Sequence, residues 1–485
     1  MRFVLVAFAL AAGCHARPVA PEPPTITCPG DPRCDDATVG QSVLNKVDVL
    51  FVLDDAPSMS VKLAALESAL PSFLATLAGG SMPVSYHWGV VTTDLGAGPQ
   101  TLPSFGCRPG GDGAKLRDAG GSGGVRYIDD NQLTGTSNVA DVAGALAALV
   151  DVPATGCEFR QPLEAAYRAL RSDVPENAGF LRSDALLVVL FLSDADDCST
   201  PPTTDLFDPA ATQYGTLDRF RCTQFGIACN GTPVPPMPIS GLSGCTSQTM
   251  ADGGKLFDVD RYLNFFNKPA AQGGVKVDPN HVILAAIAAP SDPVGVSITS
   301  PCAGDAGVAM CPTLNRSCIS VSDQRFAGDP AVRLNSVVSA ARNDNLASVC
   351  NGDDTAPLDA VARMILAQTT MGCLPTPVTT RVDGTPDCIV DDVTSNPDGS
   401  TTVTDLPWCT LNGHTPPCWQ LEDRLAEYDA EGCTAPPAPP AATCKLPASC
   451  QPLVVAGTRQ LYSITVDRGG APTPVGTGTN ITCAK

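Results

Sequence analysis

Residues 47–60 read VDVLFVLDDAPSMS, a mainly apolar run that ends in two aspartates and continues into small and hydroxyl-bearing residues. The run does not alternate between apolar and polar side chains, which is typical of a strand covered on both faces within a parallel sheet. Residues 58–77 place leucines and a phenylalanine mostly three or four positions apart, which predicts a helix with one apolar face and a bend near Pro71. A buried strand followed by such a helix is the opening unit of an α/β fold.

Short apolar runs and amphipathic stretches go on alternating as far as about residue 368. Further strands are predicted at residues 86–93, 185–192 and 282–289. Helices are expected at residues 139–150, 161–171, 259–266, 330–342 and 358–367. This order predicts a doubly wound, mostly parallel sheet with helices on both faces.

The remaining stretches differ in composition from this α/β region. Two long inserts are rich in glycine, proline and cysteine, and the segment from residue 373 onward is rich in proline, threonine and cysteine. Loops of this length in a compact domain are usually functional or cross-linked. We predict four parts: a signal peptide (1–13), a Pro-rich tether (14–44), an α/β domain (45–372) with inserts 198–257 and 290–326, and a small β-rich, disulfide-rich module (373–485).

The first residues have the layout of a bacterial lipoprotein signal. Arg2 precedes an apolar run at residues 3–12, which ends at Gly13 and Cys14. We expect cleavage before Cys14 and lipidation of its side chain, although an ordinary signal peptide with a nearby cysteine is the alternative. The chain resembles lipoproteins in which a residue other than aspartate after the lipidated cysteine favours the outer membrane of the bacterial cell envelope, and His15 stands at that position. We expect no later segment to span the bilayer, so that lipid alone would anchor the chain.

Cysteine usage points to the same compartment. The chain has 21 cysteines, and setting aside Cys14 leaves an even number for disulfides, which are rare in a reducing cytosol. Structural zinc is the competing explanation, but no CxxC pair occurs and the chain has only four histidines. The spacing does not give the pairing, although Cys28/Cys34 and Cys222/Cys229 are close enough to form local loops.

The formal net charge is −20, and the acidic residues are spread along the chain. This composition argues against nucleic acid as a partner, because binding to phosphates requires a clustered basic face. Acidic surfaces attract divalent cations, but plain solubility also explains the charge.

Acid clusters follow two of the predicted central strands. Asp54 and Asp55 come after the first, and Asp194 follows the strand at 185–192. Since ligands of open parallel sheets bind beyond the carboxyl ends of the strands, Asp54 and Asp194 are expected to meet there, beside the Ser58 hydroxyl. Such hard oxygen ligands suit Mg²⁺ or Ca²⁺. The neighbouring Asp196 and Asp197 are read as groups that support the ligands of this site, as a second cation site, or as loop caps.

Residues 47–60 resemble the opening of a von Willebrand factor type A domain, and the resemblance covers about residues 47–368. Domains of this family carry an Asp-x-Ser-x-Ser metal site completed by a threonine and a distal aspartate from other loops. The resemblance implies Asp54, Ser58 and Asp194 as ligands of Mg²⁺ or Ca²⁺. Ala56 replaces the first serine, and Thr155 and Gln161 are the nearest candidates for the second loop.

The domain order also resembles bacterial lipoproteins in which such a domain precedes a cysteine-rich tail. We therefore expect a non-enzymatic surface lipoprotein that binds a protein or other macromolecule, with the bound cation accepting a carboxylate of the partner. A structural envelope component with an inert metal site is one alternative. An envelope hydrolase is another, but its only motif, GGSGG at residues 120–124, lacks the strand and helix of a nucleophile elbow.

Overall fold

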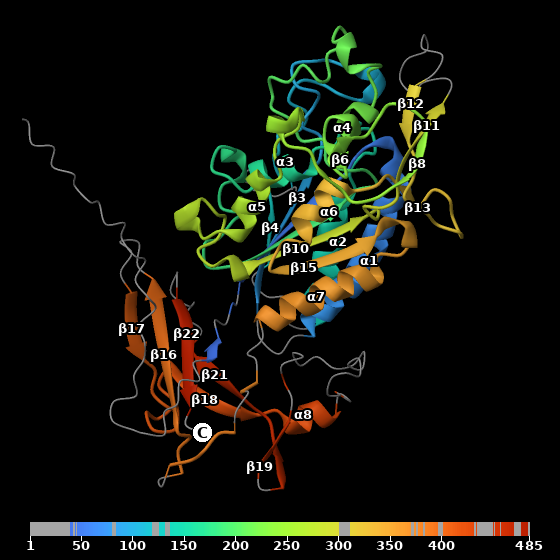
Figure 1. Cartoon of the computed structure of the whole chain (residues 1–485). Helices are drawn as coiled ribbons and strands as arrows, with labels where there is room; N and C mark the ends of the chain where they lie inside the picture. Colours follow the sequence, from blue (N-terminus) through green and yellow to red (C-terminus); the bar gives the residue numbers. More distant parts are fainter. Residues whose placement is uncertain are drawn as a thin grey trace, which may run out of the picture.

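The computed structural model has an α/β domain and a smaller β-rich module (Figure 1). It describes residues 39–41, 44, 46–79, 84–118, 126–130, 136–299, 311–369, 373–374, 377–381, 384–395, 401–430, 433, 450, 452–455, 457–469 and 477–483. The predicted signal peptide, Cys14, Cys28, Cys34 and the loop at 120–124 lie outside these residues.

A six-stranded sheet forms the centre of the α/β domain, in the order β15-β10-β5-β2-β3-β4. Its strands are β2 (Lys46–Leu53), β3 (Ser85–Thr92), β4 (Ile128–Asp130), β5 (Leu186–Leu192), β10 (Val282–Ala288) and β15 (Asn343–Ser348). All neighbours pair in parallel except β3 and β4. Counted along the chain, the spatial order is 3-2-1-4-5-6, that of a doubly wound nucleotide-binding-type sheet. The predicted fold class is confirmed.

Helices cover both faces of the sheet because the central strands are apolar on both sides. Side chains of α1 (Ser60–Ala78), α2 (Thr136–Val150) and α7 (Thr355–Thr369) share one buried cluster with one face of the sheet. Those of α3 (Pro162–Ala169), α5 (Asp260–Asn267) and α6 (Val332–Val338) share a second cluster with the other face. The apolar surface buried in each layer stabilises the domain by about 25 cal/mol per Å².

Among the described residues, one helix, Pro57–Ala78, is long and apolar enough to cross a membrane, contrary to our expectation. It comprises α1 and the short 3-10 turn Pro57–Met59 before it. Its apolar face, including Leu66, Leu70 and Phe73, is buried in the core of the α/β domain. The segment is therefore the core helix that the sequence pattern predicts.

The two inserts fold together. The first contains α4 (Phe220–Gln224), β6 (Ile227–Cys229), β7 (Thr232–Pro233), β8 (Ile239–Leu242) and β9 (Cys245–Ser247). The second contains β11 (Val294–Thr299), β12 (Cys311–Leu314) and β13 (Cys318–Ile319), which pairs with β14 (Ala327–Gly328). β8 of the first insert pairs with β11 of the second, so the inserts form one shared sheet.

Disulfides fix these inserts, but the predicted local pair is wrong. Cys222 bonds to Cys198, and Cys229 bonds to Cys245. Antiparallel pairing of β6 and β9 sets Cys229 directly opposite Cys245, which explains why the neighbour in sequence is not the partner. The other disulfides of the α/β domain include Cys107–Cys157 and Cys318–Cys350.

The C-terminal module is β-rich and cross-linked, as predicted. Its elements are β16 (Cys388–Ser395), β17 (Thr401–Asp405), β18 (Cys418–Asp423), α8 (Leu425–Ala430), β19 (Leu453–Val455), β20 (Thr458–Gln460), β21 (Tyr462–Asp467) and β22 (Thr477–Cys483). Its disulfides include Cys373–Cys450, Cys388–Cys483 and Cys409–Cys418. β1 (Val39–Gln41) pairs with β22, so residues that we assigned to the tether form an edge strand of this module.

Candidate functional site

Asp54 and Asp194 lie side by side where the direction of the strand order reverses. β2 and β5 are adjacent and parallel, with Leu53 opposite Leu192, so each aspartate follows its strand at the same edge of the sheet. The Asp54 amide donates a hydrogen bond to Leu192 O at 2.9 Å. This edge is where open α/β sheets bind their ligands, and the predicted meeting of the two carboxylates is confirmed.

A buried arginine lies among the three predicted metal ligands. Arg160 Nε is 3.0 Å from Asp54 Oδ2, while its Nη2 is 2.9 Å from Ser58 Oγ and 3.3 Å from Asp194 Oδ1. The Arg160 side chain is only 2% exposed. One guanidinium thus contacts all three groups that a bound cation would have joined.

Lys62 supplies a second positive charge. It lies in the first turn of α1, and its Nζ is 2.7 Å from Asp194 Oδ2 and 2.9 Å from the Ser58 carbonyl oxygen. With Asp54 and Arg160, these residues form a buried set of two carboxylates and two cations. Removing charges from water is costly unless they are paired, and in this set each charge has an opposite partner.

The remaining oxygens of Asp54 are also satisfied. Asp54 Oδ1 accepts a hydrogen bond from the Ala56 amide at 2.9 Å, and Oδ2 accepts one from the Ser193 hydroxyl at 2.8 Å. Burial alone would raise the pKa of Asp194, but Arg160 and Lys62 hold it below its ordinary value. Burial opposes the charged form of Arg160, yet Asp54 and Asp194 raise its pKa, so the guanidinium stays charged.

This arrangement does not fit a metal ion at Asp54, Ser58 and Asp194. A cation on these ligands would have to displace the Arg160 guanidinium, which already satisfies them. Ala56 offers no side-chain oxygen to compensate for the desolvation of the ion. The geometry is that of a closed network of ion pairs.

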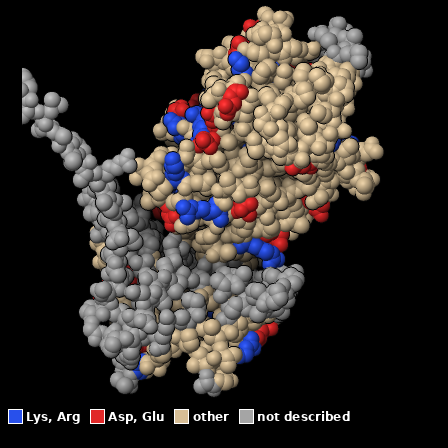
Figure 2. Space-filling model, viewed as in Figure 1, with Lys and Arg blue, Asp and Glu red and all other residues tan. Residues whose placement is uncertain are grey.

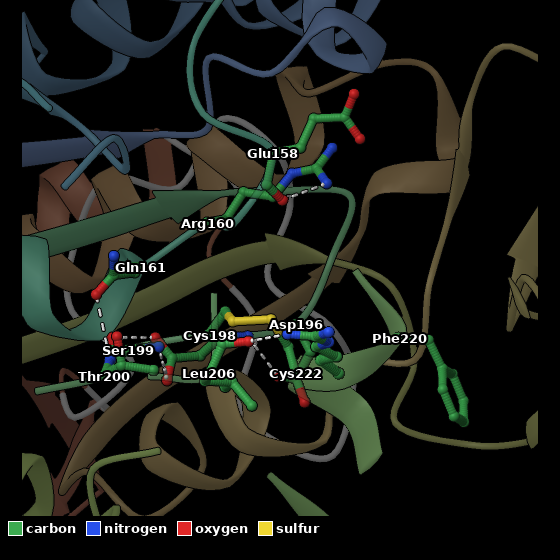
Figure 3. Close-up of a disulfide and its surroundings, with 12 residues drawn as sticks. Glu158, Arg160, Gln161, Asp196, Cys198, Ser199, Thr200, Leu206, Phe220 and Cys222 are labelled. Atoms are coloured by element: carbon green, nitrogen blue, oxygen red, sulfur yellow. Dashed lines mark hydrogen bonds between the residues drawn. A yellow bond between two sulfur atoms is a disulfide. The ribbon is translucent and has the colours of Figure 1, made fainter. Parts of the chain in front are cut away.

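Neither tentative ligand of the second loop points at this network. Gln161 donates from Nε2 to Gly96 O at 2.9 Å, and its Oε1 accepts from the Thr200 amide at 3.2 Å (Figure 3). The Thr155 amide donates to Pro153 O in a tight turn. Within the described residues, no hydrogen bond joins the Thr155 hydroxyl to Asp54, Ser58 or Asp194. Arg160, directly before Gln161, occupies the place that we had assigned to these two residues.

No protein-family model matches the sequence, and neither does any curated protein sequence. Among solved structures, the pilus adhesin SpaC from Lactobacillus rhamnosus GG in its open conformation is 10% identical, with a TM-score of 0.31, over 91% of this chain and 39% of its own. A von Willebrand factor type A structure from Catenulispora acidiphila is 10% identical, with a TM-score of 0.28, over 92% of this chain and 61% of its own. The pilus adhesin RrgA from Streptococcus pneumoniae is 10% identical, with a TM-score of 0.29, over 92% and 58%.

The chain thus spans less than two thirds of each of these three structures. At such TM-scores the likeness identifies neither a family nor a function. The strand order of the sheet itself establishes the fold.

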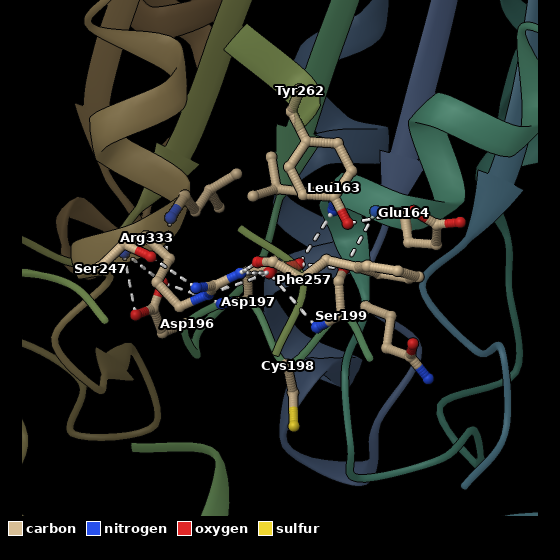
Figure 4. A network of polar contacts seen from close by, with 12 residues as sticks. Leu163, Glu164, Asp196, Asp197, Cys198, Ser199, Ser247, Phe257, Tyr262 and Arg333 are labelled. Atoms are coloured by element: carbon tan, nitrogen blue, oxygen red, sulfur yellow. Dashed lines mark hydrogen bonds and ion pairs between the residues drawn. The ribbon is translucent and has the colours of Figure 1, made fainter. Parts of the chain in front are cut away.

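A second buried network lies beside the first and decides the roles of Asp196 and Asp197 (Figure 4). Asp196 accepts hydrogen bonds from the backbone amides of Arg333 and Leu334, at the start of α6. The Arg333 guanidinium pairs with Asp197 Oδ2 at 3.1 Å and donates to Ser247 Oγ at 2.7 Å. These contacts confirm the capping alternative for Asp196 and make Asp197 the partner of a buried arginine.

A cavity of about 440 Å³ opens beside Ser58, Lys62 and Asp194. Its other wall comes from the second insert and includes Ile319 and Arg325. Ile319 is 55% exposed and Val321, two residues on, is fully exposed. Apolar and cationic side chains therefore meet at the rim of the predicted adhesion face.

Charges of both signs are mixed on one face of the molecule. On the face shown in Figure 2, lysine and arginine side chains lie among aspartates and glutamates and form no continuous basic stripe. Tight binding to a phosphate backbone needs such a stripe.

Proposed function

We propose that this protein is a non-enzymatic lipoprotein of the bacterial cell envelope, lipidated at Cys14, that binds a protein or other macromolecule at the carboxyl edge of its main sheet. The disulfides support export, because such cross-links persist in oxidising compartments. The proposal assigns no cation to Asp54, Ser58 and Asp194, since Arg160 and Lys62 already neutralise them.

The rim of the cavity beside Ser58 is the observation that carries the proposal. Ile319 lines the cavity and is exposed, and Val321 is exposed two residues further along the chain. The Arg325 side chain is 71% exposed and pairs with Asp323. Interfaces draw much of their affinity from aromatic, apolar and arginine anchors grouped around a pocket. We therefore propose a partner that presents an acidic side chain next to apolar ones.

Site-specific photo-cross-linking in producing cells tests this assignment. A photoreactive residue at Ile319 or Val321 should give a discrete cross-linked product, and the product should weaken when Arg325→Ala is added. Chelator should leave it unchanged. A matched probe at Leu346, an exposed apolar residue on edge strand β15, serves as the control. Absence of a product at both rim positions, or equal products at Leu346, would reject the rim as the binding surface.

A structural envelope component is the second candidate. The ion pairs of Arg160 favour it, because they are what an inert adhesion site requires. In that case the inserts and the C-terminal module make the contacts. Cross-links from a probe at Val454, which is 71% exposed on β19, without any from Ile319 would support this alternative.

A further inference from the structure

Three carboxylates that form no ion pair with Arg160 converge at the carboxyl edge of the sheet. Asp55 follows β2, Asp94 follows β3, and Asp112 lies in the loop beyond. One oxygen of each lies within 4.8 Å of one oxygen of both others. We propose that Asp55, Asp94 and Asp112 bind one hard divalent cation.

Two oxygens of this triad are buried without a hydrogen-bond donor. Asp55 is 5% exposed and Asp94 is 1% exposed. Asp55 Oδ1 and Asp94 Oδ2 have no hydrogen-bond partner among the described residues. Leaving a buried acceptor unsatisfied costs about 1–3 kcal/mol, and more when it is charged. Buried carboxylate oxygens without donors, in a group of three carboxylates that lie this close together, are what a cation requires.

The other oxygens of the triad are held in place by the protein. Asp94 Oδ1 accepts from the Gly96 amide at 2.8 Å, and Asp112 Oδ2 accepts from the Thr92 hydroxyl at 2.7 Å. The Asp112 amide also donates to the Asp94 carbonyl oxygen at 2.8 Å. These contacts orient the carboxylates in the way that partners of metal ligands do.

Two glycines let the backbone come close to the triad. A Cβ on Gly156 would lie 2.1 Å from Asp55 Oδ1, and one on Gly111 would lie 2.3 Å from Asp94 Oδ1. The disulfide Cys107–Cys157 ties the loop of Asp112 to the loop of Gly156. The site is thus enclosed by cross-linked backbone, and any other residue at either glycine would collide with a carboxylate.

Positive charge from the protein balances the triad only in part. Arg108 pairs with Asp112, and its Nη1 lies 3.6 Å from Asp94 Oδ2, but its side chain is 59% exposed. No cationic side chain of the described residues forms an ion pair with Asp55. A divalent cation would supply the missing positive charge, and carboxylate oxygens are the ligands that Mg²⁺ and Ca²⁺ prefer.

None of the three aspartates lines the cavity beside Ser58, and the test of the triad needs no partner. Calorimetric titration of CaCl₂, MgCl₂ and MnCl₂ into chelator-treated mature protein should show one cation per chain for at least one metal. Asp55→Asn and Asp94→Asn should abolish that uptake. Arg108→Gln should tighten it by about tenfold, because a competing charge is removed.

Two controls separate the triad from its neighbours. Ser58→Ala alters the Arg160 network, and Asp354→Asn removes another buried carboxylate with an unpartnered oxygen. Both variants should keep the uptake of one cation. Thermal unfolding provides an independent readout, since the metal should raise the Tm of the wild type and of both controls but not that of Asp55→Asn. No uptake by the wild type and by Arg108→Gln, or undiminished uptake by Asp55→Asn, would overturn the proposal.

Discussion

Arg160 Nε lies 3.0 Å from Asp54 Oδ2, although 106 positions separate the two residues in the sequence. The contact joins the loop before α3 to the end of β2, at the centre of the sheet. It places a side chain of the protein where the sequence resemblance calls for a metal ion. The presence of Arg160 at this place affects both the stability of the domain and its dependence on cations.

Truncating the buried arginine should destabilise the α/β domain. Arg160→Ala leaves Asp194 paired with Lys62 but leaves Asp54 buried without an ion-pair partner among the described residues. Breaking a buried pair typically costs about 3–5 kcal/mol. The control variant Arg325→Ala alters an exposed pair and should change the free energy of unfolding by less than about 1 kcal/mol. Urea unfolding of Arg160→Ala and of Arg325→Ala measures both free energies. Similar losses for both variants would mean that the network contributes little.

Removing both cations should make the first site respond to metal. In an Arg160→Ala, Lys62→Ala double variant, Asp54, Ser58 and Asp194 would face one another without a positive charge. Mg²⁺ should then raise the Tm of this variant more than that of the wild type, because the ion binds only the folded state. An equal response of both proteins would show that Ala56 leaves too few ligands even without Arg160.

The Cys107–Cys157 disulfide should matter for stability and for cation uptake. Replacing both cysteines by serine frees loops 50 residues apart and should cost about 2–5 kcal/mol. Uptake by the Asp55 triad should weaken as well, since the two loops enclose it. The matched double variant at Cys409 and Cys418, in the C-terminal module, should lose stability but keep uptake. Equal cation uptake by the wild type and by both double variants would show that the Cys107–Cys157 disulfide does not affect the triad.

Stability should fall as the pH rises from about 4 to about 7, with Asp354 as one cause. Burial and the charge of Asp353 raise the pKa of Asp354 from 3.8 to about 7. Between these values the folded protein holds a proton that the unfolded chain has lost, so the free energy of unfolding decreases with pH by up to about 1.4 kcal/mol per unit. The stability that this proton on Asp354 contributes is fully present below about pH 4 and is lost above about pH 7.

Comparing variants isolates this contribution from other buried groups. Asp354→Asn should flatten the pH profile of unfolding between pH 4 and 7, while the exposed Asp173→Asn should leave it unchanged. A profile of the Asp354 variant that runs parallel to that of the wild type would remove Asp354 as the cause.

The sequence predicts the interior of the sheet well because buried parallel strands must be apolar. The run at 185–192 matches β5 within one residue, and the run at 282–289 matches β10 equally well. The edge strand β15 reads NDNLAS and was not predicted, since an edge strand exposes much of its surface and needs no apolar run. β4, three residues long, is too short to give a pattern.

The candidate site was predicted only in part. Strand ends point to Asp54 and Asp194, because the ends of adjacent parallel strands must meet. Arg160 lies in an irregular loop where no periodicity marks it, and the family pattern calls for an oxygen ligand there, which favoured Thr155 and Gln161. Two carboxylates at the centre of a sheet without a full set of metal ligands require positive charge, and that requirement would have singled out the arginine.

The pairing of β1 with β22 decides how a pull on the N-terminal end of the chain is carried. Tension applied before Val39 meets only a three-residue edge pairing, which would peel away first and leave the disulfide-linked β16 and β22 in place. The load would then pass to Lys46, where β2 begins, and run along a central strand held in parallel by β3 and β5. With a partner bound at the carboxyl end of β2, the force would act between that end and Lys46. The sheet would then be loaded in shear, the geometry in which its hydrogen bonds resist together.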